Sequence, residues 1–234
     1  MSDDAKTNAD HWPSLFSWSV VGVGFIAAVA AILFFAWLAE EMLEGDTMVF
    51  DNAVRAFVHE HSSEALTTVM RAFTFVGSTI FLGILTSIVL LVFVIGRHWW
   101  STVVFGVMMS GAILLNFVLK TSFARDRPTT YFDTPVPNSY SFPSGHALFS
   151  LCFYVSLAWI LTRHLNGVWH RATVWTLMAM LVVGVGLSRI YLGVHYPSDV
   201  IAGYTAALIW LIAATSADRW LSARSWLSKK RRKN

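Results

Sequence analysis

The chain has 234 residues, of which 56% are hydrophobic and only 13% are charged, with a formal net charge of +3. A soluble domain usually carries about 25% charged residues, so this composition argues against an ordinary soluble protein and predicts a membrane protein. The single cysteine, Cys152, excludes a disulfide framework within the chain.

Six apolar segments are long enough, or nearly so, to cross a membrane as helices of about 20 residues. In chain order they are Trp18–Ala39, Ala72–Gly96, Trp99–Leu119, Ala147–Thr162, Ala172–Ser188 and Val200–Ala217. The fourth reaches full length if it begins near Pro143. We therefore expect an all-α fold, a six-span transmembrane helical bundle at residues 18–217. A polar N-terminal tail (1–17) and a basic C-terminal tail (218–234) flank this membrane domain.

The loop between the first and second spans contains apolar residues at helical spacing. They are Val49, Phe50, Ala53, Val54, Phe57 and Val58. We expect an amphipathic helix that lies at the outer membrane interface. It would serve as a structural cover for the bundle, as a substrate gate, or as both.

The distribution of lysine and arginine predicts the orientation of the spans. An even number of spans places both termini on one side, and the basic C-terminal tail marks that side as cytoplasmic. The turns "GRHWW" and "RHLNGVWHR" are basic and fall on the same side. Two external loops break this rule, because they carry Lys120, Arg125, Arg127 and Arg189. A specific anionic partner would explain positive charge there.

The first of these basic clusters, "KTSFARDRP", directly follows the third span. Lys120 and Arg127 are seven residues apart, so on a continuing helix they would share one face. Arginine presents a planar fork that suits phosphate oxygens, and lysine presents a point charge. Pro128 would stop the helix. The alternative is a solvated loop that happens to be basic.

The second cluster, "PSGH", opens the fourth span at Pro143. Ser144 is a good helix-start residue, and Gly145 lets the backbone approach a ligand closely. The unpaired N–H groups of a helix start form an anion site. His146 would then lie in the first turn, at the rim of the bilayer. The alternative is a capped helix with an interfacial histidine.

The third cluster, "SRIYLGVHYPSD", leads into the sixth span. Arg189 is another candidate anion ligand. Asp199 could accept a hydrogen bond from Nδ1–H of His195, which would leave Nε2 of that imidazole unprotonated and nucleophilic. Alternatively, Asp199 is only a favourable charge in the first turn of a helix.

All three clusters fall on the external ends of their spans. Together they supply three cationic groups, two histidines, one carboxylate and two helix N-termini. This inventory suits phosphoryl transfer, in which positioning and charge neutralisation do most of the catalysis.

At these residues the sequence resembles the type 2 phosphatidic acid phosphatase (PAP2) superfamily, in its membrane-bound lipid phosphatase branch. The signature of that family is Lys-x6-Arg-Pro, Pro-Ser-Gly-His and Ser-Arg-x5-His-x3-Asp. The segments "KTSFARDRP", "PSGH" and "SRIYLGVHYPSD" match it in order and without a departure. The resemblance covers residues 120–199. The N-terminal half of the chain carries no family motif.

The resemblance implies a role for each matched residue. His195 is expected to be the nucleophile, oriented by Asp199, and His146 the general acid and then the base. The expected ligands of the phosphoryl oxygens are Lys120, Arg127, Ser144, Gly145 and Arg189. Arg125 lies outside the matched positions and is a candidate headgroup contact. The family uses no metal or other cofactor, and the crowded cationic groups agree with this because they would repel a divalent ion.

The sequence therefore predicts a phosphatase of the cytoplasmic membrane that acts on lipid phosphates at the outer face. Candidate substrates are phosphatidic acid, phosphatidylglycerol phosphate and polyprenyl diphosphates. Membrane lipids are the expected surroundings, and no nucleic-acid partner is expected. One alternative is a lipid phosphotransferase that uses the same site. Another is a transporter with His146, His195 and Asp199 as a proton relay or a metal site.

Overall fold

The structure is a computed structural model that describes residues 14–163 and 165–231, with side chains described at 22–163 and 165–218. Every regular element in these ranges is an α-helix. The helices are α1 (Ser14–Glu44), α2 (Thr47–Glu60), α3 (Glu64–Val76), α4 (Thr79–Ile95), α5 (Trp99–Phe123), α6 (Gly145–Arg163), α7 (Val168–Tyr191) and α8 (Pro197–Arg231). The expected all-α class is confirmed.

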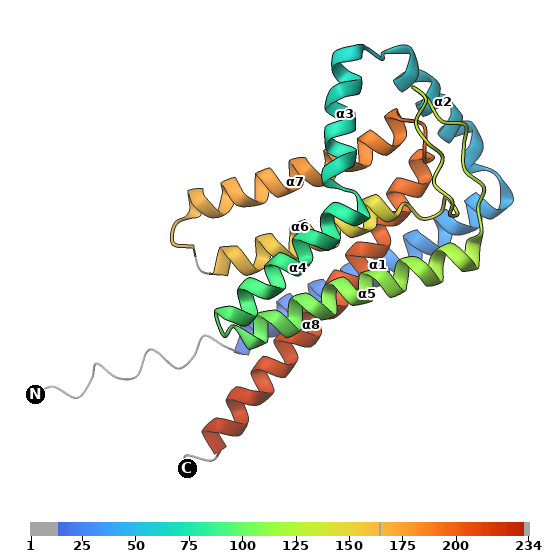
Figure 1. Ribbon diagram of the computed structural model, residues 1–234. Coiled ribbons are helices and arrows are strands. Elements are labelled where there is room, and N and C mark those ends of the chain that lie inside the picture. The colour runs from blue at the N-terminus through green and yellow to red at the C-terminus, as the bar shows by residue number, and fades with distance from the viewer. Residues whose placement is uncertain (1–13, 164, 232–234) are drawn as a thin grey trace, which may run out of the picture.

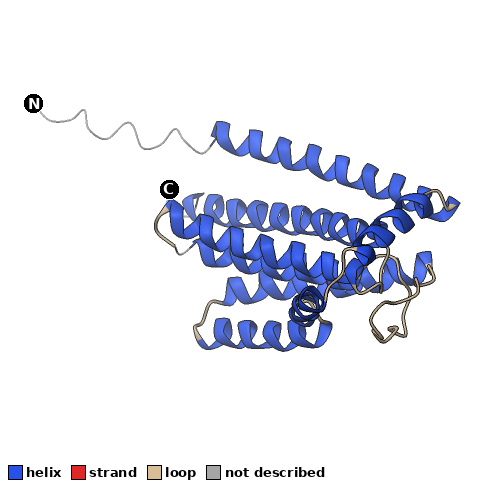
Figure 2. Cartoon of the chain, turned by 90° about the horizontal axis from the view of Figure 1, so that it is seen from above, coloured by secondary structure: helices blue, strands red, loops and turns tan. Residues whose placement is uncertain are grey.

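The long helices run side by side, and the connections between them lie at the two ends of the bundle (Figures 1 and 2). One end carries α2 and the long loop at residues 124–144, and we call it the loop end. The start of α1 and the end of α8 lie at the opposite end. Both ends of the described chain are therefore on one side of the bundle, as an even number of spans requires.

Five helices are long and apolar enough to cross a membrane, namely α1, α5, α6, α7 and α8. The pair α3 and α4 passes the same test together, although it is bent by 46°. If this pair counts as one span, the described chain has the six spans that the sequence predicts. The polar tail was expected at 1–17 and the basic tail at 218–234. Positions 1–13 and 232–234 lie outside the described residues, and the α8 backbone continues to Arg231.

The bend falls at Gly77 and Ser78, where the sequence predicts an unbroken span from Ala72. Ser78 caps α4 because its hydroxyl accepts a hydrogen bond from the Phe81 amide (3.2 Å). At Gly77, an added Cβ would lie 2.3 Å from a methyl group of Val185. The break therefore lets α3 pack closely on α7 while α4 turns toward α5.

The core lies around α6, which packs against α5, α7 and α8. Its centre includes the fully buried side chains of Phe105, Met108, Leu148 and Phe153. At the end opposite the loops, the Asp218 carboxylate accepts hydrogen bonds from Trp100 Nε1 (2.7 Å) and Arg163 Nη2 (3.1 Å). These bonds join α5, α6 and α8, so the far end of the bundle is fixed independently of the loop end.

The expected amphipathic helix in the first loop is present as α2. Several of its apolar side chains point outward, with Val49 82% and Phe57 62% exposed, whereas Val54 and Val58 are partly buried against the bundle. Its buried face is polar and consists of Thr47, Asp51 and Arg55. Because lipid is apolar, an outward apolar face is the stable arrangement at a membrane interface. The polar face needs buried partners, and the residues of the site supply them.

Candidate active site

The three sequence clusters come together at the loop end of the bundle. Lys120 lies in the last turn of α5, and Arg127 lies in the loop that follows. His146 lies in the first turn of α6, Arg189 in the last turn of α7, and Asp199 in the first turn of α8. Residues far apart in the sequence thus meet because the ends of α5 and α7 and the starts of α6 and α8 lie at the same end of the bundle (Figure 1).

The start of α6 is held against the start of α8. The Ser144 amide donates to the Asp199 carbonyl (2.9 Å), and the Ser144 carbonyl accepts from the Leu148 amide (3.0 Å) as the helix begins. Gly203 of α8 permits this approach, since an added Cβ would lie 2.6 Å from the Ser144 carbonyl oxygen. The segment Pro143–His146 is therefore a rigid part of the helix bundle.

His195 and Asp199 form a buried pair. His195 is 1% exposed and Asp199 is fully buried, and His195 Nδ1 lies 3.3 Å from Asp199 Oδ2. The same carboxylate oxygen accepts from the Tyr196 amide (2.9 Å) and from the Ser141 hydroxyl. A carboxylate at this position favours the tautomer with hydrogen on Nδ1, so Nε2 carries the lone pair.

Burial lowers the pKa of His195 to about 3, although the hydrogen bond and the charge of Asp199 act in the opposite direction. The imidazole is therefore neutral at neutral pH. Arg127 Nη1 lies 3.2 Å from Nε2 and can donate to its lone pair. A neutral imidazole with Nε2 directed at a guanidinium is a suitable nucleophile for an anion that the guanidinium binds.

The cationic groups surround this imidazole. Arg127 also donates to backbone carbonyls of Ser139 (2.7 Å) and Val194 (2.8 Å), and burial lowers the pKa of its guanidinium. Lys120 donates to the Tyr140 carbonyl, and Arg189 to the Thr74 hydroxyl. All three lie within electrostatic reach of His146, as does His195.

Two buried polar atoms of the expected phosphate ligands have no hydrogen-bond partner among the described residues. They are Ser144 Oγ and Arg189 Nε. Buried polar groups are normally hydrogen-bonded, and an unpaired one calls for an explanation. Both atoms belong to residues that the sequence predicts as ligands of phosphoryl oxygens, and a bound phosphoryl group would supply the acceptor that each lacks.

Arg125, the candidate headgroup contact, takes part in ion pairs within the protein. Its side chain is only 9% exposed and forms ion pairs with Asp199 Oδ1 (2.7 Å) and Asp51 Oδ2 (2.9 Å). It also lies over the Tyr196 ring, 4.1 Å from the centroid. The polar face of α2 brings a second carboxylate to this arginine, and the headgroup contact stays a prediction.

Sequence reasoning missed Asp51, Ser141 and Ser198, which all hydrogen-bond within this cluster. Only Asp51 had a signal, because Thr47, Asp51 and Arg55 recur every four residues on α2. Among the residues whose positions are described, no group of three or more His, Cys, Asp or Glu is placed to hold a metal ion.

Comparison with known proteins identifies the family. The pattern of the PAP2 superfamily matches residues 109–222. Phosphatidylglycerophosphatase B of Bacillus subtilis (strain 168) is 31% identical over 182 residues, which cover 77% of this chain and 89% of that protein. An undecaprenyl-diphosphatase of Sulfolobus acidocaldarius is 42% identical over 98 residues, covering 40% of this chain and 43% of that protein.

Solved structures agree with this assignment. The crystal structure of a transmembrane PAP2 type phosphatidylglycerolphosphate phosphatase from Bacillus subtilis superposes with a TM-score of 0.75 at 30% identity, covering 82% of this chain and 96% of that one. Aquifex aeolicus LpxE shares the fold, with a TM-score of 0.55 at 21% identity over 71% of this chain and 95% of that one. The resemblance carried by the three motifs is thus confirmed, and the chain belongs to the PAP2 superfamily as a multi-pass membrane phosphatase.

Proposed function

We propose that this protein hydrolyses lipid phosphate monoesters or diphosphates through a covalent phosphohistidine at His195. The observation that carries the proposal is the buried His195 imidazole, with Nδ1 beside the Asp199 carboxylate and Nε2 facing the Arg127 guanidinium. The unpaired polar atoms of Ser144 and Arg189 support a phosphoryl group at the same place.

In the first step, the lone pair of His195 Nε2 attacks phosphorus and the bond from phosphorus to the leaving oxygen breaks. His146 donates a proton to that oxygen, and Asp199 stabilises the positive charge that develops on the imidazole. In the second step, His146 removes a proton from a water molecule, whose oxygen attacks phosphorus and breaks the phosphorus–nitrogen bond. His195 then returns to its neutral form, and phosphate is released.

The cationic residues stabilise charge on the transferring group. Lys120, Arg127 and Arg189 would bind its oxygens together with Ser144 Oγ and the backbone at Gly145, where α6 begins. Because these groups are fixed by bonds within the protein, they need little reorganisation when the substrate binds. This arrangement supplies electrostatic stabilisation without a bound metal ion, so no cofactor is proposed.

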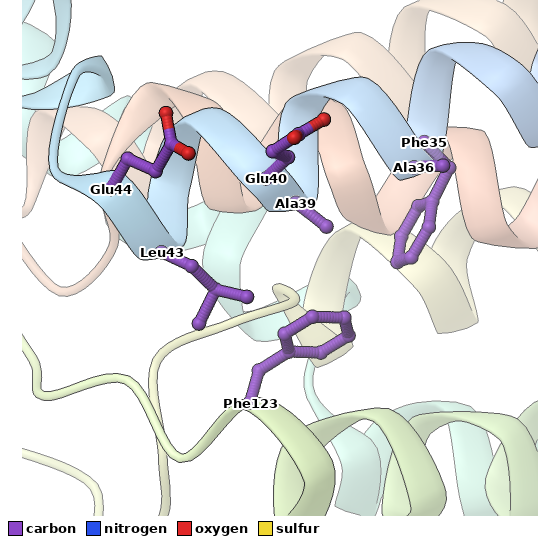
Figure 3. Close-up of a pocket in the computed structure, with 7 residues that line it drawn as sticks. All are labelled: Phe35, Ala36, Ala39, Glu40, Leu43, Glu44 and Phe123. Atoms are coloured by element: carbon purple, nitrogen blue, oxygen red, sulfur yellow. The ribbon is translucent and has the colours of Figure 1, made fainter.

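An apolar groove beside the site supports a lipid substrate. It has a volume of about 500 Å³ and lies between α1 and the end of α5. Figure 3 shows Phe123 facing Ala39 and Leu43 across the groove, while the carboxylates of Glu40 and Glu44 point away from Phe123. The Phe123 ring packs on Phe142 at 5.0 Å, one residue before Pro143. An acyl or prenyl chain in the groove would therefore lie close to the phosphoryl site.

Filling this groove should weaken the binding of long-chain substrates. Ala36→Trp places an indole among the lining residues, so we expect the KM for a long-chain lipid phosphate to rise about three- to tenfold through lost apolar contact. The KM for a short-chain analogue should stay unchanged. Leu33→Trp is the matched control, because Leu33 is 64% exposed on the same helix and does not line the groove. If the two substitutions changed the KM equally for long-chain and short-chain substrates, the groove would not be the binding site of the lipid chain.

We propose the loop end as the external, or periplasmic, face of the cytoplasmic membrane. The support is the basic sequence at the end of α8, which favours the cytoplasm for the opposite end. The relatives make phosphatidylglycerol phosphate and polyprenyl diphosphates the first substrates to examine. A transporter would require ionisable groups spread through the depth of the membrane, whereas the site groups gather at the loop end.

The direct test is a phosphate-release assay on purified full-length protein. The panel contains phosphatidic acid, phosphatidylglycerol phosphate and a polyprenyl diphosphate, each with and without EDTA. We expect release from at least one of them at a rate that EDTA does not change. A lipid acceptor added in parallel distinguishes hydrolysis from phosphotransfer, because transfer would lower the yield of free phosphate. A strict requirement for a divalent metal would refute the mechanism.

A further inference from the structure

The interfacial helix α2 is joined to the reaction centre through one carboxylate. Asp51 is fully buried although it lies on a helix whose apolar face is exposed. A buried carboxylate is costly unless each oxygen is paired. The partners of the Asp51 carboxylate therefore show which parts of the structure it holds together.

Both oxygens of Asp51 bind the start of α8. Oδ1 accepts from the Ser198 amide (2.9 Å), and Oδ2 accepts from the Ser198 hydroxyl (2.6 Å). The first N–H groups of a helix have no partner within that helix. Asp51 thus caps α8 from another helix, at the residue next to Asp199.

Asp51 is also the second partner of Arg125. That guanidinium donates through Nη1 to Asp199 Oδ1 (2.7 Å) and Ser198 Oγ (2.8 Å), and through Nη2 to Asp51 Oδ2 (2.9 Å). Arg125 is therefore shared by two carboxylates, one of which belongs to the pair with His195.

Because Arg125 is shared in this way, it determines which oxygen of Asp199 can pair with His195 and how strongly Asp199 stabilises a charged imidazole. Arg125 holds Oδ1 of Asp199, so Oδ2 remains for the imidazole, and the plane of the carboxylate is fixed. Without Asp51, the full charge of Arg125 would act on Asp199 alone. The carboxylate would then stabilise positive charge on His195 less well, because a neighbouring cation would offset more of its field.

We propose that Asp51 is a positioning residue for phosphoryl transfer, which acts on Asp199 through Arg125 and Ser198 and makes α2 part of the catalytic assembly. The proposal rests on the proposed function, in which Asp199 stabilises the charged form of His195. Asp51 has no direct contact with the groups expected to bind phosphate. Its effect should therefore appear in the rate of the chemical step and leave phosphate binding unchanged.

The test compares Asp51→Asn with Asp46→Asn in full-length protein. Asparagine keeps an oxygen that can accept from the Ser198 amide but removes the charge that pairs with Arg125. We expect kcat on the best lipid phosphate to fall about tenfold or more, as coupled neighbours in an ionic network allow. The KM and the inhibition constant of inorganic phosphate should change less than about twofold. Asp46 lies just before α2, is exposed and makes no side-chain cap bond, so Asp46→Asn should retain wild-type kcat.

Ser198→Ala is a milder second variant, which removes the hydroxyl that Asp51 and Arg125 share without removing charge. If Asp51→Asn does not fold, Ser198→Ala tests the positioning role in its place. We expect its kcat to fall about threefold with an unchanged KM, because one hydrogen bond is lost. The proposal would be overturned if kcat were unchanged in the folded variants. It would also be overturned if the loss of activity matched a loss of affinity for inorganic phosphate. His195→Ala distinguishes failure of the proposed function from failure of the positioning role. If His195→Ala remains active, the proposed function itself is wrong. If His195→Ala is inactive but Asp51→Asn is fully active, only the positioning role is rejected.

Discussion

We expect His195→Ala to lose all measurable phosphate release while it stays folded. The substitution removes the atom that forms the bond to phosphorus, and no other described histidine lies next to Asp199. The loss should exceed about 10⁴-fold, because removal of a nucleophile eliminates the covalent route altogether. The measurement is phosphate release from each lipid of the panel, with size-exclusion behaviour in detergent as the check on folding.

The fold should survive this change because Asp199 keeps its other donors. Arg125 Nη1, the Tyr196 amide and the Ser141 hydroxyl all remain in place. A carboxylate that retains three donors is not left as an unpaired buried charge, which is the usual cause of severe destabilisation at such sites. Unfolding of the variant would therefore contradict the hydrogen-bond arrangement described here.

A control variant and a trapping experiment test whether the loss of activity is specific to His195 as the nucleophile. His61 is exposed at the end of α2, and its ring Nδ1 pairs with the Phe57 carbonyl of the same helix, so His61→Ala should retain activity. In the wild-type enzyme, rapid quenching in alkali should recover phosphate bound to protein, because a phosphorus–nitrogen bond is stable to base and labile to acid. Retained turnover in His195→Ala would show that the nucleophile lies elsewhere.

The meeting of the candidate site residues could largely be predicted from the sequence, because the number of spans determines which helix ends share a side of the membrane. Six spans place the ends of the third and fifth and the starts of the fourth and sixth on one side, and the structure brings Arg127 and His195 within 3.2 Å there. Distances and partners could not be predicted in this way. Ser141 reaches Asp199 only because the loop at 124–144 folds back over the site, and no local pattern encodes that path.

The orientation of α2 shows a second limit of pattern reasoning. An amphipathic pattern predicts a helix but not which face is buried, because in a membrane protein the apolar face can turn to lipid. The buried face of α2 carries Asp51, which forms an ion pair with Arg125. The pairing of Arg125 with Asp51 could not be predicted from the sequence either, because the two residues are 74 positions apart in the chain.

The bend between α3 and α4 has a similar cause. Hydropathy predicts one span from Ala72 to Gly96, since neither Gly77 nor Ser78 interrupts the apolar run strongly. The break is set by close packing of Gly77 on Val185 of α7, and this contact exists only in the folded bundle. Tertiary packing therefore overrides a local pattern that favours a continuous helix.

The second large effect is expected for His146→Gln, and it should depend on the leaving group. If His146 donates the proton to the leaving oxygen, kcat for an alkyl lipid phosphate should fall about 10²- to 10⁴-fold, the usual contribution of general acid–base catalysis. An aryl phosphate with a nitro group needs little protonation as it leaves. Its first step should therefore be nearly normal in the variant.

The same variant should then stall after that first step, because His146 is also the proposed base for the attacking water. We expect a burst of nitrophenolate close to one equivalent per active site, followed by slow turnover. His170→Gln is the matched control, since His170 is exposed near the start of α7, at the opposite end of the bundle. Because His146 lies among Lys120, Arg127 and Arg189, its loss could instead disturb phosphate binding alone. That outcome would give equal losses on both substrates without a burst, and it would remove His146 from the proton-transfer steps.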